Sequence, residues 1–87
     1  MNKLASKPAA LLVVDDEEGM RTTLADILLE CDFEVDVAEH GREAVDMASK
    51  KQYDVIVMDV RMPVMDGAQA LRLMRERDPN IKVVMMS

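Results

Sequence analysis

The stretch VIVMDVRMPVMDG, residues 55–67, decides how this chain folds. Its first four residues are apolar and three of them are β-branched, which is typical of a strand buried on both faces. The strand ends in a carboxylate, Asp59, and a loop with Pro63 and Gly67 follows. Buried strands of this kind belong to parallel sheets, whose functional groups lie just beyond the carboxyl ends of the strands. Asp59 is therefore the first candidate functional residue.

The same pattern occurs once earlier in the chain. The apolar run at residues 10–14 leads directly into Asp15 and Asp16, which begin an acidic loop. If the two strands lie side by side, three carboxylates converge at one edge of the sheet. The alternative is that these acidic residues only cap and solvate the helix that follows, whose dipole they complement.

The rest of the chain alternates between strand and helix patterns. This order, β-α-β-α-β-α-β with short connections, predicts parallel strands joined by right-handed crossovers. Residues 34–38 alternate between polar and apolar, as an edge strand does, whereas residues 81–86 are apolar enough for the interior of a sheet. The predicted strands are residues 10–14, 34–38, 55–58 and 81–86, and the predicted helices are residues 20–31, 42–50 and 68–77.

Composition and charge restrict the class of protein. The chain has 87 residues, enough for one small domain, and a net charge of −6, which argues against a general nucleic-acid surface. Cys31 is the single cysteine, so no internal disulfide is possible, and we expect it to be a small buried residue at a helix end. The apolar run at residues 9–14 is too short for a signal peptide or a membrane span. We expect a cytoplasmic protein with a disordered tail at residues 1–9 and one domain at residues 10–87.

Three carboxylates in one pocket repel one another unless a cation is present. Magnesium suits one or two carboxylates together with water and phosphate oxygens, and a carboxylate can attack phosphorus to form an acyl phosphate. The residues thus predict a magnesium-dependent phosphoryl-transfer site, against the alternative of capping and turn aspartates. His40 is expected to be a solvated loop residue, because the chain has no second histidine to form a metal pair.

Three blocks of sequence resemble the receiver domain of two-component response regulators. They are LVVDDE at residues 12–17, VMDVRMPVMDG at residues 57–67 and VVMMS at residues 83–87. The resemblance covers residues 11–87 and is most specific in the middle block. It implies an α/β, flavodoxin-like, doubly wound parallel sheet with strand order 2-1-3-4, in which a sensor histidine kinase passes a phosphoryl group to one aspartate.

The resemblance also implies a role for individual residues. Asp59 would be the phosphoacceptor, Asp16 would bind magnesium directly, and Asp15 would hold it mainly through water. The backbone carbonyl of Arg61 would supply another magnesium ligand.

Three further residues match the family motif. Pro63 and Gly67 would shape the loop before the third helix. Ser87 would hydrogen-bond the phosphoryl group and act as the switch residue.

The sequence also departs from the family pattern. A complete receiver has a lysine at the end of a fifth strand and an aromatic switch residue on that strand, whereas this sequence ends after the fourth. Lys82 is at the wrong end of its strand to substitute, and Tyr53 is expected to be a packing residue. We therefore expect a receiver that lacks its last helix-strand-helix portion. The sequence DVRMP at residues 59–63 is similar to that of regulators of sigma-54-dependent transcription.

Two alternatives remain open. The chain could be an inert fragment that acts only as a self-associating module, because a fourth strand at the sheet edge would present residues 81–86 to another chain. It could also be a phosphohydrolase of the haloacid dehalogenase type, which needs a second aspartate two residues after the nucleophile. Arg61 occupies that position, which argues against this enzyme class.

Overall fold

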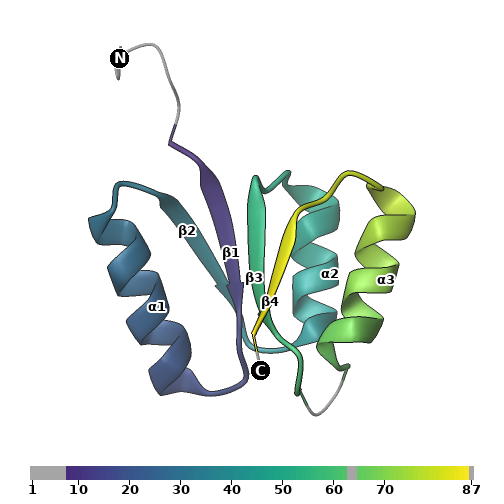
Figure 1. The fold of residues 1–87 in the computed structure, drawn as a ribbon, viewed down its shortest axis with the longest axis horizontal. Helices are drawn as coiled ribbons and strands as arrows, with labels where there is room; N and C mark the ends of the chain where they lie inside the picture. Colours follow the sequence, from purple (N-terminus) through teal and green to yellow (C-terminus); the bar gives the residue numbers. More distant parts are fainter. Residues whose placement is uncertain (1–7, 63–64, 87) are drawn as a thin grey trace.

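The computed structural model describes residues 8–62 and 65–86. Its four strands form one parallel sheet in the order β2-β1-β3-β4, as predicted, with three helices between them (Figure 1). The strands are β1 (Ala10–Val14), β2 (Glu34–Ala38), β3 (Val55–Asp59) and β4 (Val83–Met86), and the helices are α1 (Glu18–Glu30), α2 (Gly41–Lys50) and α3 (Gly67–Arg77).

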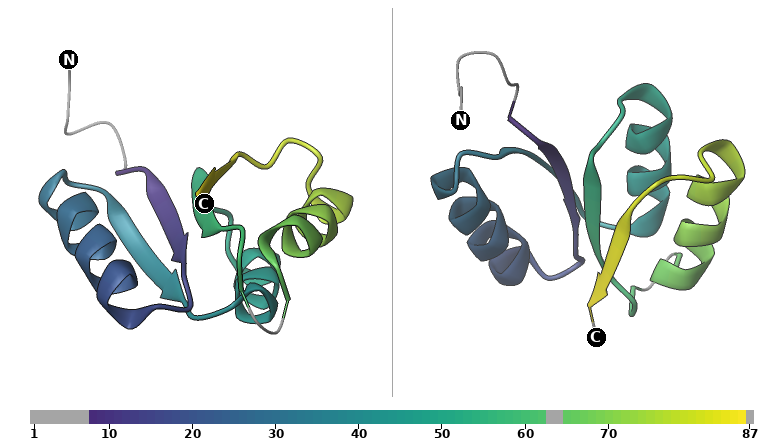
Figure 2. Two further views of the ribbon diagram at one scale, coloured as in Figure 1. Left: turned by 60° about the horizontal axis from the view of Figure 1, so that its bottom comes forward. Right: turned by 45° about the horizontal axis from the view of Figure 1, so that its top comes forward.

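The helices lie on both faces of the sheet, α1 on one face and α2 with α3 on the other (Figure 2). The main core is on the face covered by α2 and α3. Alternate residues of the central strands β1 and β3 point into it, and Ala44, Ala70 and Met74 of the two helices pack against them. The strand residues of this core are Leu12, Val14, Ile56 and Met58.

Helix α1 covers only part of its face of the sheet. It lies against β1 and β2 and has no buried residue, and Ile27 is 52% exposed. The prediction that Cys31 is buried is wrong, because Cys31 follows this helix and is exposed. On the same face, no described helix covers β4, and its Val84 is 53% exposed.

Side-chain caps explain where two of the helices begin. His40 is half-buried and its Nδ1 accepts a hydrogen bond from the Glu43 N–H at 3.2 Å, so it is the N-cap of α2. Asp66 caps α3 in the same way through the Gln69 N–H at 2.8 Å. Such caps satisfy N–H groups that have no partner inside the helix. His40 thus lies in the loop before α2, as expected, but it is half-buried and caps the helix instead of being fully solvated.

Tyr53 is a packing residue, as predicted, and it also forms a hydrogen bond to the edge strand β2. Its ring is buried, and its hydroxyl donates a hydrogen bond to Asp36 Oδ2 at 2.7 Å. Lys51 Nζ bonds the same carboxylate at 3.1 Å and also contacts Glu34. The Tyr53 hydrogen bond, reinforced by Lys51 and opposed by burial, holds the pKa of Asp36 below its ordinary value.

Gly67 allows α3 to begin directly against the end of β3. Its N–H donates to the Val60 carbonyl at 2.9 Å, and it is buried. A Cβ at this position would lie 2.6 Å from the backbone oxygen of Asp59 and 2.9 Å from the Val60 Cα. Backbone atoms cannot give way as a flexible side chain can, so a side chain here would displace α3 from the sheet.

We expect Tyr53→Phe to lower the free energy of unfolding by about 1 kcal/mol at neutral pH, because it removes the hydrogen bond to Asp36. A lowered carboxyl pKa stabilises the folded state above the unfolded value of 3.8, and this contribution is lost as the pH falls through the folded pKa. The difference between the variant and the wild type should therefore shrink below pH 3.8. Urea unfolding followed by circular dichroism on both sides of that pH measures it. An equal loss at both pH values would show that the Asp36 charge is not involved.

We expect Gly67→Ala to destabilise the chain by about 1–3 kcal/mol, as overpacking against fixed atoms does. Gly19→Ala is the matched control, because the nearest atom to its added Cβ is a side-chain oxygen 3.9 Å away on the open surface of α1. Alanine is the better helix former, so this variant should be more stable than the wild type by about 0.5–1 kcal/mol. Thermal unfolding of the two variants tests the contrast, and equal effects would contradict it.

Candidate metal and phosphoacceptor site

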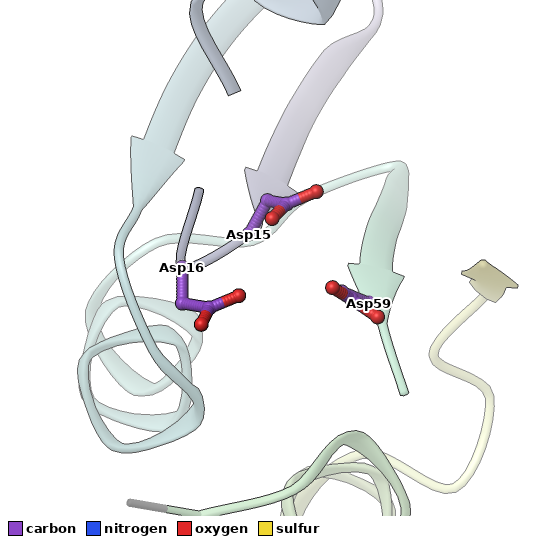
Figure 3. A group of neighbouring side chains, drawn as sticks. All are labelled: Asp15, Asp16 and Asp59. Carbon is purple, nitrogen blue, oxygen red and sulfur yellow. The ribbon is translucent and has the colours of Figure 1, made fainter. Parts of the chain in front are cut away.

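The pairing of β1 with β3 brings three carboxylates together. The two strands are parallel, and Val14 lies opposite Met58. The next residues, Asp15 directly after β1 and Asp59 at the end of β3, therefore lie at the same level, and Asp16 follows Asp15. One carboxylate oxygen from each of the three lies within 4.8 Å of the others (Figure 3). The structure thus places together the three carboxylates that the sequence identified.

These carboxylates line a cleft of about 160 Å³ at the carboxyl edge of the sheet. Asp15 forms its inner wall because it is only 4% exposed, whereas Asp59 is half-buried and Asp16 is exposed. The cleft is thus closed toward the core and open toward solvent, as a site that exchanges ligands must be. Glu17, Met20 and Met86 complete the lining. The sequence patterns did not identify these three residues as part of the site, because their proximity depends on the fold.

Backbone N–H groups orient two of the carboxylates. The Glu17 N–H donates to Asp15 Oδ1 at 2.9 Å, and the Arg61 N–H donates to Asp59 Oδ1 at 3.0 Å. Each bond uses one lone pair of Oδ1, so both oxygens of the carboxylate can still accept a ligand. The carboxylates are therefore partly preorganised by residues two positions further along the chain.

The predictions for the remaining site residues are not tested by the structure to the same extent. Arg61 is exposed and contacts Asp59 through its backbone N–H, and the ligand role of its carbonyl stays a prediction. Pro63 and Ser87 lie outside the described residues. Lys82 precedes β4, at the end of the strand opposite the cleft.

The donor set fits a hard divalent cation. All three side chains offer carboxylate oxygens, which such ions prefer, and a cation would offset the repulsion between the three charges. With no nitrogen or sulfur donor in this group, the cluster does not resemble a zinc or copper site.

In the described part of the chain, no helix is long and apolar enough to cross a bilayer.

Solved receiver structures share this fold. The response regulator TrrA from Thermotoga maritima, solved in complex with Mg²⁺ and BeF, superposes with a TM-score of 0.85 at 32% identity, over 88% of this chain and 67% of that one. A chain of the CheX–CheY–BeF3–Mg²⁺ complex from Borrelia burgdorferi gives a TM-score of 0.90 at 32% identity, over 98% of this chain and 66% of that one.

Comparison with the sequences of known proteins agrees with the structural comparison. The chemotaxis protein CheY of Listeria monocytogenes is 44% identical over 78 residues, which are 88% of this chain and 66% of the relative. A protein-glutamate methylesterase/protein-glutamine glutaminase of Archaeoglobus fulgidus is 49% identical over 78 residues, 88% of this chain but only 22% of that protein. The chain therefore spans from about a fifth to about two thirds of these relatives. Residues 11–87 match the response regulator receiver domain, and the chain belongs to this family.

Proposed function

We propose that Asp59 is the phosphoacceptor of this receiver domain and that Asp15 and Asp16 hold the Mg²⁺ that its phosphorylation requires. The observation that carries this proposal is the convergence of three carboxylate oxygens within 4.8 Å at the ends of two adjacent parallel strands. The Mg²⁺ complexes of TrrA and of CheY, both similar in fold, support the choice of cation. As the resemblance to receiver domains implies, the exposed Asp16 would bind the ion directly and the buried Asp15 would act mainly through water.

The residues suggest how the reaction proceeds. The Asp59 oxygen that does not accept the Arg61 N–H attacks the phosphorus of a phosphohistidine, and the bond from phosphorus to the imidazole nitrogen breaks. The histidine of the kinase keeps the electron pair of that bond, and Asp59 becomes an acyl phosphate. Bound Mg²⁺ would offset the charge of the transferring group, with the Arg61 carbonyl as a further ligand. Ser87 would donate a hydrogen bond to the phosphoryl oxygen.

The partner in this proposal is a sensor histidine kinase, and the chain itself acts in the cytoplasm. The chain itself acts as a signalling module, with no substrate of its own beyond phosphodonors. Its net charge of −6 disfavours direct contact with nucleic acid, so a transcriptional output would belong to another domain.

We expect acetyl phosphate with magnesium chloride to add one phosphoryl group to the chain. Intact-mass spectrometry should detect the adduct in the wild type, and both Asp59→Asn and chelation of magnesium should abolish it. Asp46→Asn is the matched control because Asp46 is an exposed carboxylate on α2, and it should leave the adduct unchanged.

The opposite result would favour the inert module. A folded wild-type chain that gains no phosphoryl group would show that the three carboxylates do not suffice for the reaction in this chain. Circular dichroism of the same sample establishes that the chain is folded.

We also propose that the chain self-associates through β4. The two edges of the described sheet differ in charge: β2 carries Glu34 and Asp36, both bonded by Lys51, whereas β4 carries four apolar residues. Charged side chains protect an edge strand from pairing, and an apolar edge is open to it. A second copy pairing β4 with β4 about a two-fold axis would extend the sheet and cover Val84.

We expect Val84→Lys to convert the dimer to a monomer, because it places a charge in the unprotected edge strand. Val37→Lys is the matched control, since Val37 is similarly exposed, at 42% against 53%, but lies on the protected edge strand β2. Light scattering coupled to size exclusion measures the mass of each variant. A wild-type chain that stays monomeric, or two variants with the same effect, would contradict the proposal.

A further inference from the structure

Arg21 connects three segments around the cleft. It lies in α1, and its Nη1 donates a hydrogen bond to the backbone oxygen of Asp15 at 2.8 Å. Its Nη2 is 3.7 Å from a carboxylate oxygen of Glu39, which follows β2. The Arg21 side chain is only 12% exposed, whereas that of Glu39 is 69% exposed. One guanidinium therefore joins α1 to the residues that follow both β1 and β2.

The Asp15 carbonyl needs such a partner. Asp15 is buried and lies between β1 and α1, outside both elements. Its N–H donates to the Ala38 carbonyl at 3.2 Å and its carboxylate accepts the Glu17 N–H, so Arg21 completes the set of bonds to this residue. Buried backbone oxygens are almost always paired, and a bond from a charged donor is among the stronger kinds.

Other attachments of α1 are weak at this end. Its N-cap, Glu17, makes no side-chain capping bond, in contrast to the caps of α2 and α3, and the helix has no buried residue. Together with the bond from the Glu17 N–H to the Asp15 carboxylate, the Arg21 hydrogen bond thus anchors the start of α1 to the end of β1. It fixes the loop that carries Asp15 and Asp16.

We propose that Arg21 is a positioning residue of the cation site, which sets its Mg²⁺ affinity by holding Asp15 and Asp16 toward Asp59. This inference rests on the proposed function of the carboxylates. Arg21 itself is not among the residues that line the carboxylate cleft. Its effect passes through the Asp15 backbone, as outer-shell partners of metal ligands act.

The direction in which Mg²⁺ affinity changes when Arg21 is removed distinguishes a positioning role from an effect of its charge alone. A positive charge near the cleft repels a cation, so an Arg21 that acted only by its charge would weaken Mg²⁺ binding, and removing it would strengthen binding. A positioning role predicts the opposite. Lysine keeps the charge but lacks the forked geometry that lets one guanidinium contact both loops.

The experiment is calorimetric titration of the chain with magnesium chloride. We expect Arg21→Ala to weaken Mg²⁺ binding about tenfold, in the range seen for outer-shell partners, and Arg21→Lys to weaken it less. Arg72→Ala is the matched control because it removes the same charge from the exposed face of α3 and should leave the affinity unchanged. Circular dichroism without magnesium establishes that each variant is folded.

A second readout needs no metal. Hydrogen exchange of the Glu17 N–H, which donates to Asp15, should be faster in metal-free Arg21→Ala than in the wild type, because the loop is released.

Each outcome bears on a different proposal. Unchanged or tighter Mg²⁺ binding by Arg21→Ala would overturn the role of Arg21 and leave the proposed function intact. A wild-type chain that binds no Mg²⁺ would overturn the proposed function and this inference together.

Discussion

The parallel pairing of β1 with β3 is the constraint on which the other features depend. It is held by apolar side chains that are fully buried in both strands, and it places Val14 opposite Met58. Apolar burial of roughly 25 cal/mol per Å² is what allows a sheet to carry unfavourable charges at its edge. The three carboxylates that follow these strands repel one another, and the core keeps them together despite that cost.

The two faces of the sheet are built differently, and this difference shapes the site. On one face, α2 and α3 are capped by side chains and packed into a dry core. On the other, α1 covers part of the sheet with half-exposed residues and no side-chain cap. Regions with few buried contacts open more easily than the core. The carboxylates on the loop before α1 therefore depend on polar contacts for their position, whereas Asp59 depends on the packed strand that carries it.

The edge strands differ in a related way. In β2, two carboxylates form a hydrogen-bonded network with Lys51 and the buried Tyr53, both from the connection between α2 and β3. This network pairs the charges of the partly exposed edge strand. In β4, no described side chain supplies such a network. Met86 belongs to this apolar strand and also lines the carboxylate cleft, so the open edge and the site are adjacent.

The succession of strands and helices along the chain, the parallel sheet and the acidic cluster were predictable from local patterns: apolar runs, helical spacing and a carboxylate at the end of a strand. The order of the strands within the sheet followed from the family resemblance. The environment of single residues was not predictable from the sequence. Cys31 is exposed and His40 caps a helix because of which surfaces the neighbouring elements cover and how the chain turns before α2. Arg21 shows no distinctive motif, and its role emerges only where the ends of two strands and the start of a helix meet. Periodicity along the chain therefore determined the elements and their order, whereas contacts between residues distant in sequence, which only tertiary packing creates, decided which side chains are buried, capped or bound.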